Sequence, residues 1–172
     1  MTTIEDHLPR FPKQDLFSWR VGKGDQGEVF VVSRKRNLVA KTYDPYWGIG
    51  LELAQHEYHV ADSLYRSGIS VPRPEGVFEV SSLWRRQTYP AFVMERICGA
   101  VRMDKLSNQD RSGVYDFARQ LREEEAEKAS RLGFIVADAT DRNCFYLPQD
   151  KKVILYDFLF WRAPDTPSSW EI

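Results

Sequence analysis

The chain has 172 residues, of which 42% are hydrophobic and 13% aromatic, so it is too apolar to be intrinsically disordered and is able to form a packed core. Its 24 basic and 25 acidic residues leave a formal net charge of −1, which provides no overall field that would draw the chain to nucleic acid or to an anionic membrane. No apolar run approaches the roughly 20 residues that a membrane span requires. The two cysteines, Cys98 and Cys144, lack metal-ligand spacing and are typical of buried free thiols in a reducing cytoplasm.

The first half of the chain predicts a sheet and one helix. Residues 1–16, with two prolines and mixed charge, predict an arm laid over the surface. Alternating or β-branched segments predict five strands, at 17–21, 28–32, 38–43, 76–81 and 89–95. A helix is expected from Leu51 to Arg66 and should end before Gly68. Its inward-facing residues recur at helical spacing: Leu53, Glu57, Val60 and Leu64.

The second half predicts one long helix followed by a short hairpin. Ser107 is a candidate N-cap for a helix that ends near Leu132, before Gly133. The expected buried stripe of this helix consists of Val114, Ala118, Leu121, Ala129 and Leu132. The glutamates between 123 and 127 predict a solvated face, and residues 144–147 and 153–156 predict the hairpin. Together these elements indicate an α+β fold.

A glycine-rich stretch follows the first predicted strand. Gly22, Gly24, Gly27 and Val29 have the spacing G-x-G-x-x-G-x-V. Glycines at such positions allow backbone amides to approach phosphate oxygens, because no Cβ intervenes. The dinucleotide-binding fingerprint shares this spacing but is followed by a helix, whereas a strand is predicted here. The pattern therefore favours a hairpin that covers a nucleotide, with an ordinary glycine-rich turn as the alternative.

Lys41 is the one charge in an apolar predicted strand, Leu-Val-Ala-Lys-Thr-Tyr. A lysine there either reaches solvent at the strand end or pairs with a buried anion. Glu57 faces inward on the following helix and is the expected partner, which would direct the ammonium toward nucleotide phosphates. Glu52 is the alternative partner, although its place near the helix start already favours a carboxylate.

Three polar residues near the end of the chain are candidates for catalysis and metal binding. Asp157 ends an apolar strand, where a carboxylate is costly unless it is paired or binds metal. Asn143 and Asp157 would supply oxygen ligands to magnesium, and Asp138 would accept a proton from an attacking hydroxyl. The alternative is that Asp138 and Asp141 organise a turn and Asp157 caps one. His56 and His59 share a helix face, but the chain offers no third ligand to complete a metal site with them.

In this order, these motifs resemble those of the protein-kinase-like superfamily, including the small RIO-type kinases and the aminoglycoside and choline phosphotransferases. The resemblance covers about residues 17 to 160 and implies ATP and Mg²⁺ as cofactors. It implies a bilobal fold, with a five-stranded antiparallel N-lobe sheet and one helix over 17–95, and a reduced, mainly helical C-lobe over 96–172. It also implies that residues 92–96 form the hinge, which would hold adenine through backbone groups. The residues it marks for the nucleotide are the loop glycines, Val29, Ala40, Lys41, Glu57, Glu95 and Ile97.

The chain also departs from the family pattern. Val136 and Ala137 replace the usual His-Arg before the catalytic aspartate, Thr140 replaces a common lysine, and Leu159 replaces the glycine of Asp-Phe-Gly. Fifteen residues follow Asp157, which leaves no room for an activation segment. We therefore expect a minimal kinase fold, or a truncated one, whose acceptor is selected by the arm, the tail, a partner protein or a second copy of the chain.

The expected function is an ATP-dependent phosphotransferase that acts on a hydroxyl, with a protein Ser or Thr favoured over a small molecule as acceptor. The alternative is a pseudokinase, a binding module with Trp161 and Trp170 as partner anchors, unless these tryptophans pack onto the second lobe. A nucleic-acid binder has little support, because the basic run at 34–36 is short. The kinase hypothesis requires Lys41, Glu57, Asn143 and Asp157 to converge on one nucleotide site.

Overall fold

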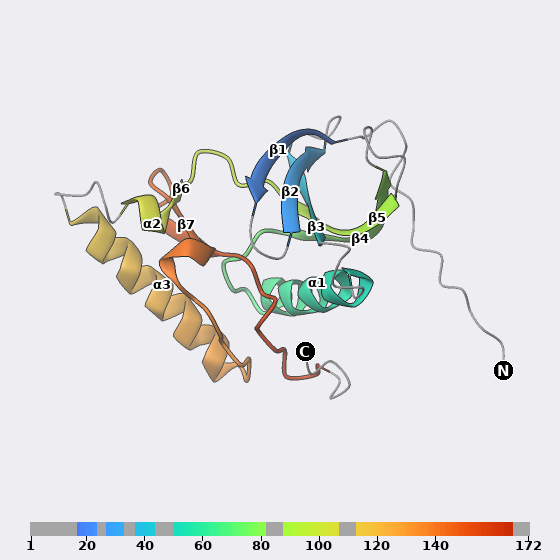
Figure 1. Ribbon diagram of the computed structural model, residues 1–172. Coiled ribbons are helices and arrows are strands. Elements are labelled where there is room, and N and C mark those ends of the chain that lie inside the picture. Colours follow the sequence, from blue (N-terminus) through green and yellow to red (C-terminus); the bar gives the residue numbers. More distant parts are fainter. Residues whose placement is uncertain are drawn as a thin grey trace. The chain divides into compact units, whose positions relative to one another are not determined.

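The protein was analysed as a computed structural model, which describes residues 17–23, 27–32, 37–43, 50–81, 88–106 and 113–166 (Figure 1). The chain divides into two compact units, one formed by Met1–Tyr58 and Glu75–Arg96, the other by His59–Pro74 and Ile97–Ile172. Several sequence-based predictions lie outside the described residues: the arm at 1–16, Gly24, the basic run at 34–36 and Trp170. The predicted Ser107 cap is wrong, because the long helix begins at Val114 with Gly113 as its N-cap.

The first unit contains a five-stranded antiparallel sheet. Its strands are β1 (Phe17–Lys23), β2 (Gly27–Val32), β3 (Leu38–Tyr43), β4 (Pro74–Ser81) and β5 (Thr88–Glu95). The strand order is β1-β2-β3-β5-β4, so that β3 is central. The five predicted strands are confirmed, with bounds that differ by at most two residues.

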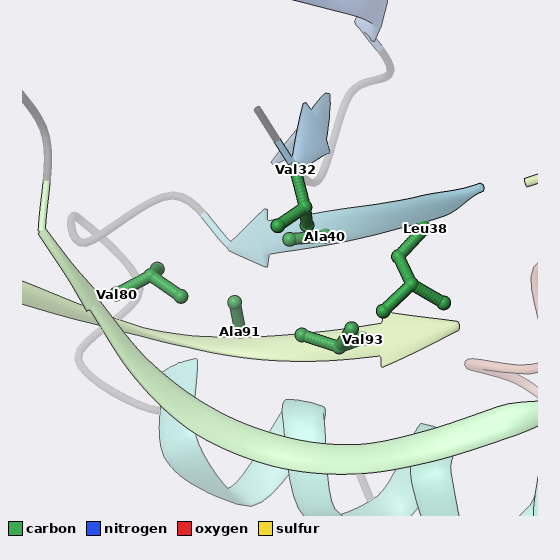
Figure 2. Packing of buried hydrophobic residues seen from close by; sticks show 6 residues of the cluster. All are labelled: Val32, Leu38, Ala40, Val80, Ala91 and Val93. Atoms are coloured by element: carbon green, nitrogen blue, oxygen red, sulfur yellow. The ribbon is translucent and has the colours of Figure 1, made fainter. Parts of the chain in front are cut away.

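One face of this sheet carries a compact apolar cluster. Figure 2 shows its six side chains directed toward one another from β2, β3, β4 and β5. They are all buried and small or branched: Val32, Leu38, Ala40, Val80, Ala91 and Val93. Because successive side chains of a strand point to opposite faces, Val39, Lys41 and Tyr43 lie on the other face of β3.

That other face packs against helix α1 (Gly50–Arg66). The ring of Tyr58 meets the ring of Phe92 edge-on, with centroids 6.1 Å apart, which fixes the helix against β5. The predicted helix and its inward residues are confirmed, since Leu53, Glu57 and the other two members of the stripe are buried. Gly68 follows with φ +73°, a left-handed conformation that favours glycine and ends the helix.

The second unit combines helices with a small sheet. Its elements are β6 (Val101–Arg102), α2 (Met103–Leu106), α3 (Val114–Arg131), the 3₁₀ turn η2 (Asp141–Asn143), β7 (Cys144–Leu147) and β8 (Lys152–Leu155). The predicted hairpin is β7–β8, which β6 extends to three antiparallel strands. Neither β6 nor α2 was predicted, because both are too short to show a periodicity. The whole described structure is thus α+β, with three α-helices.

Helix α3 departs from the predicted stripe at its end. Ala118 and Ala129 are buried as expected, but Leu132 is 47% exposed because it is the C-cap, where the helical phase ends. The glutamate run is likewise not a uniform solvated face. Glu125 is half-buried and accepts a hydrogen bond from the Ser70 N–H at 2.9 Å, which ties α3 to the segment after α1.

The two cysteines, both predicted to be buried, differ in the structure. Cys144 is buried, and burial raises the pKa of its thiol to about 12, so it is an inert core residue. Cys98 is exposed, and its predicted burial is wrong, since it lies in the irregular segment after β5.

Trp161 packs in the core edge-on to Phe158 rather than serving as an exposed anchor. Among the described helices, none is long and apolar enough to cross a membrane.

Candidate functional site

A buried ion pair lies between β3 and α1 in the first unit. The Lys41 ammonium donates to both carboxylate oxygens of Glu57, at 3.0 Å to Oε1 and 2.8 Å to Oε2. Glu57 is fully buried and Lys41 is only 8% exposed. The predicted pairing is therefore confirmed, and the alternative partner Glu52 is exposed in the first turn of α1. A lone ion at this depth would be strongly disfavoured, so each charge depends on the other.

Tyr43 completes this pair and was not identified from the sequence. Its hydroxyl donates to Glu57 Oε2 at 2.5 Å, and its ring centroid lies 5.4 Å from the Lys41 ammonium nitrogen. Tyr43 is buried, and it shares a face with Lys41 because the two residues are two apart in one strand. That spacing was the only available sequence signal, since the contact with Glu57 joins residues 14 apart.

The strand register shows which predicted nucleotide residues share the face of Lys41. Val29 in β2 and Phe92 in β5 lie directly opposite Lys41, and directly paired residues point to the same face. Val29 is half-buried beside the lysine. Ala40 instead belongs to the cluster on the opposite face, as Figure 2 shows, whereas its neighbour Val39 shares the face of Lys41.

The predicted hinge, residues 92–96, comprises the end of β5 and Arg96. Glu95 is exposed and pairs in register with Leu38, and the Arg96 N–H donates to the Asn37 carbonyl at 2.7 Å. Ile97 is half-buried and begins the second unit. Residues 96–98 form an irregular segment after β5.

The glycines of the predicted phosphate loop have different structural roles. At Gly27, a Cβ would lie 1.9 Å from the Thr42 carbonyl oxygen, so the close approach of β2 to β3 excludes any side chain. At Gly22, a Cβ would meet only Val29, at an ordinary 3.6 Å. Packing therefore explains Gly27, whereas it does not explain Gly22 and leaves it available for a functional role.

This difference leads to a prediction for the two alanine variants. Gly27→Ala should destabilise the fold by about 2 kcal/mol or more, because the backbone must shift to relieve the clash. Gly22→Ala should change the free energy of unfolding by less than about 0.5 kcal/mol while weakening nucleotide binding. Urea unfolding of both variants measures the first effect and calorimetric titration with MgATP the second. Equal stability of the two variants would contradict the assignment of Gly27 to strand packing.

In the second unit, the loop that contains η2 joins Asp138 to Asn143. The Asn143 side-chain amide donates to the Asp138 carbonyl at 3.1 Å and to its carboxylate Oδ2 at 2.8 Å. The Thr140 N–H also donates to the Asp138 carbonyl, at 2.7 Å. Asp138 is exposed and has φ +57°, an uncommon conformation for a residue other than glycine. The two predicted residues are thus brought together, with the carboxylate held at the surface.

Asp141 anchors this loop to α3. Its carboxylate accepts a hydrogen bond from the Tyr115 hydroxyl at 2.7 Å and forms an ion pair with Arg122. The hydrogen bond to this carboxylate raises the pKa of Tyr115 above its usual value. The sequence indicated only a turn-forming role for Asp141, because partners 19 and 26 residues away leave no local signal.

Asp157 directly follows Tyr156, which is hydrogen-bonded to the loop that contains η2. The Tyr156 N–H donates to the Asn143 carbonyl at 3.0 Å, and the Tyr156 hydroxyl donates to the Arg142 carbonyl. Asp157 has φ +66°. The three non-glycine residues of positive φ in the described part of the chain are thus Asp138, Asp157 and Lys151 of the β7–β8 turn. Such conformations persist where surrounding contacts hold them, and they cluster at functional sites.

Asn143 and Asp157 are the two side chains that the sequence suggested as magnesium ligands. Mg²⁺ is usually held by one or two carboxylates with water and substrate phosphates, rather than by an all-protein cage. Asn143 and Asp157 would supply two oxygen ligands, and the residues that the structure describes contain no cluster of three His, Cys, Asp or Glu side chains. Of the two histidines of α1, His56 is buried, and His59 Nε2 lies 3.2 Å from a carboxylate oxygen of Asp165.

A scan of the chain against protein-family models and a search of curated proteins each gave no match. The functional assignment therefore rests on the geometry of the residues themselves.

Proposed function

We propose that the protein is an ATP- and Mg²⁺-dependent phosphotransferase with a bilobal, protein-kinase-like fold, which transfers the γ-phosphoryl group to a hydroxyl, with a protein Ser or Thr as the favoured acceptor. The observation that carries this proposal is the buried Lys41–Glu57 pair, because a charge kept at that depth is expected to serve an anion.

In the first unit, Lys41 would bind the α- and β-phosphates, while Glu57 holds its ammonium in place. The side chains of Val29 and Val39 lie on the same face and would contact the nucleotide, and backbone groups at Glu95 and Ile97 would bind adenine. Strands β2, β3 and β5 carry all of these residues except Glu57 and Ile97, so their positions are set before the nucleotide arrives, which would reduce the entropy lost on binding.

In the second unit, Asp138 would accept the hydroxyl proton as the acceptor attacks the γ-phosphorus. The carboxylate is suited to this because it is exposed and its backbone is held by Asn143 and Thr140. Asn143 and Asp157 would hold Mg²⁺, which would neutralise negative charge on the nucleotide phosphates.

The test is phosphoryl transfer from γ-labelled ATP, to the chain itself and to offered protein and small-molecule acceptors, by the wild type and by Asp157→Ala. We expect transfer by the wild type and a loss of at least about 100-fold in the variant. Transfer that is equally fast in both would contradict the metal role of Asp157.

A nucleotide-binding module without transfer is the second candidate. Val136 and Ala137 favour it, since they stand where kinases usually carry His-Arg before the catalytic aspartate. Calorimetry distinguishes the candidates: MgATP binding without transfer indicates the binding module, and the absence of both excludes the phosphotransferase.

A further inference from the structure

Glu57 accepts more hydrogen bonds than a simple ion pair provides. Lys41 donates to both carboxylate oxygens, and Tyr43 donates to one of them from the same strand. All three residues are buried, so water contributes little to holding the carboxylate. Two donors that arrive from fixed points of β3 define the plane of the carboxylate more closely than the lysine alone, on its flexible stem, would do.

Tyr43 also contacts the lysine itself. The ammonium lies 5.4 Å from the centroid of the tyrosine ring, within the range of a cation–π interaction. One side chain therefore holds the carboxylate through its hydroxyl and the ammonium through its ring. Because Tyr43 and Lys41 are on the same strand face, the backbone fixes the spacing between these contacts.

We infer that Tyr43 is a positioning residue, which sets the direction of the Lys41 ammonium through Glu57 and so tunes the affinity of the first unit for nucleotide phosphates. This inference rests on the proposed function for its ligand, a nucleoside di- or triphosphate with Mg²⁺. Tyr43 does not touch the phosphates in this role. Of the trio formed by Lys41, Glu57 and Tyr43, loss of the tyrosine hydroxyl would leave only Lys41 to donate to the carboxylate. The ammonium would then be drawn toward Glu57 and away from an incoming anion.

The matched variants are Tyr43→Phe and Tyr58→Phe. Each removes one hydroxyl and keeps the ring, and Tyr58 is the neighbour of Glu57 on α1 but lies outside the trio. Calorimetric titration with MgATP, MgADP and adenosine should show Kd raised about tenfold in Tyr43→Phe for the two phosphorylated ligands and unchanged for adenosine. Tyr58→Phe should bind all three as the wild type does. A folded Tyr43→Phe that binds MgATP normally, or that loses adenosine to the same extent, would overturn the inference.

A second measurement does not depend on nucleotide binding. The measurement is a double-mutant cycle of Tyr43→Phe and Lys41→Met, with the equilibrium constant for unfolding of each variant determined in urea. The factor by which the double variant changes this constant should differ at least about fivefold from the product of the factors of the two single variants. Additive changes within about twofold would overturn the positioning role. If the wild type binds no nucleotide yet the cycle shows coupling, the proposed function fails while the link from Tyr43 to Lys41 stands.

Discussion

Replacing Asp138 with asparagine should lower the rate of phosphoryl transfer by roughly 10³-fold and leave the affinity for MgATP unchanged within about twofold. The substitution removes the proton acceptor and keeps the shape of the side chain. Asparagine tolerates the positive φ of this position, and its carbonyl can still accept from Asn143. Single-turnover transfer and calorimetric titration measure the two effects separately.

The matched control for Asp138 is Asp150→Asn, the same exchange at an exposed turn between β7 and β8. It should leave both rate and affinity unchanged. If Asp138→Asn transfers phosphate as fast as the wild type, Asp138 is a turn-forming residue and the proposed base lies elsewhere. If it loses nucleotide affinity together with rate, the carboxylate acts on binding rather than on the transfer step.

The main elements were predictable because their signals are local. Strand alternation and helical spacing located β1 to β5 and α1 almost to the residue. The same periodicity placed Lys41 and Glu57 on facing surfaces, so their pairing followed from one strand and one helix. The pairing of Asp138 with Asn143 was also within reach, since both belong to one short loop.

What the sequence did not reveal depends on contacts between distant residues or on the ends of elements. Tyr43 and Asp141 differ from their neighbours only in the partners they reach, and those partners are 14 or more residues away. Leu132 has the helical spacing of the buried residues of α3. It is the C-cap, however, and helical spacing no longer determines which face a side chain occupies where the helix ends. Cysteine is usually buried, yet Cys98 lies in an irregular segment that has no core side.

Breaking the buried ion pair should have the largest effect on stability. Glu57→Ala should lower the free energy of unfolding by about 3–5 kcal/mol, because it leaves the Lys41 charge buried without its counter-ion and also removes the acceptor of Tyr43. Urea unfolding measures the loss. The control is Arg66→Ala on the same helix, which breaks an exposed pair with Asp62 and should cost less than about 1 kcal/mol.

The double variant Lys41→Met, Glu57→Leu separates stability from function. Apolar residues of similar volume avoid the cost of burying two charges, so this variant should recover most of the stability that Glu57→Ala loses. It should nevertheless bind MgATP at least about 100-fold more weakly than the wild type, because no ammonium remains to meet the phosphates. Recovery of stability without binding would mean that the fold does not need the pair and that its charge serves an anion. A stable double variant that binds MgATP normally would remove Lys41 from the nucleotide site, and with it the observation on which the phosphotransferase proposal depends.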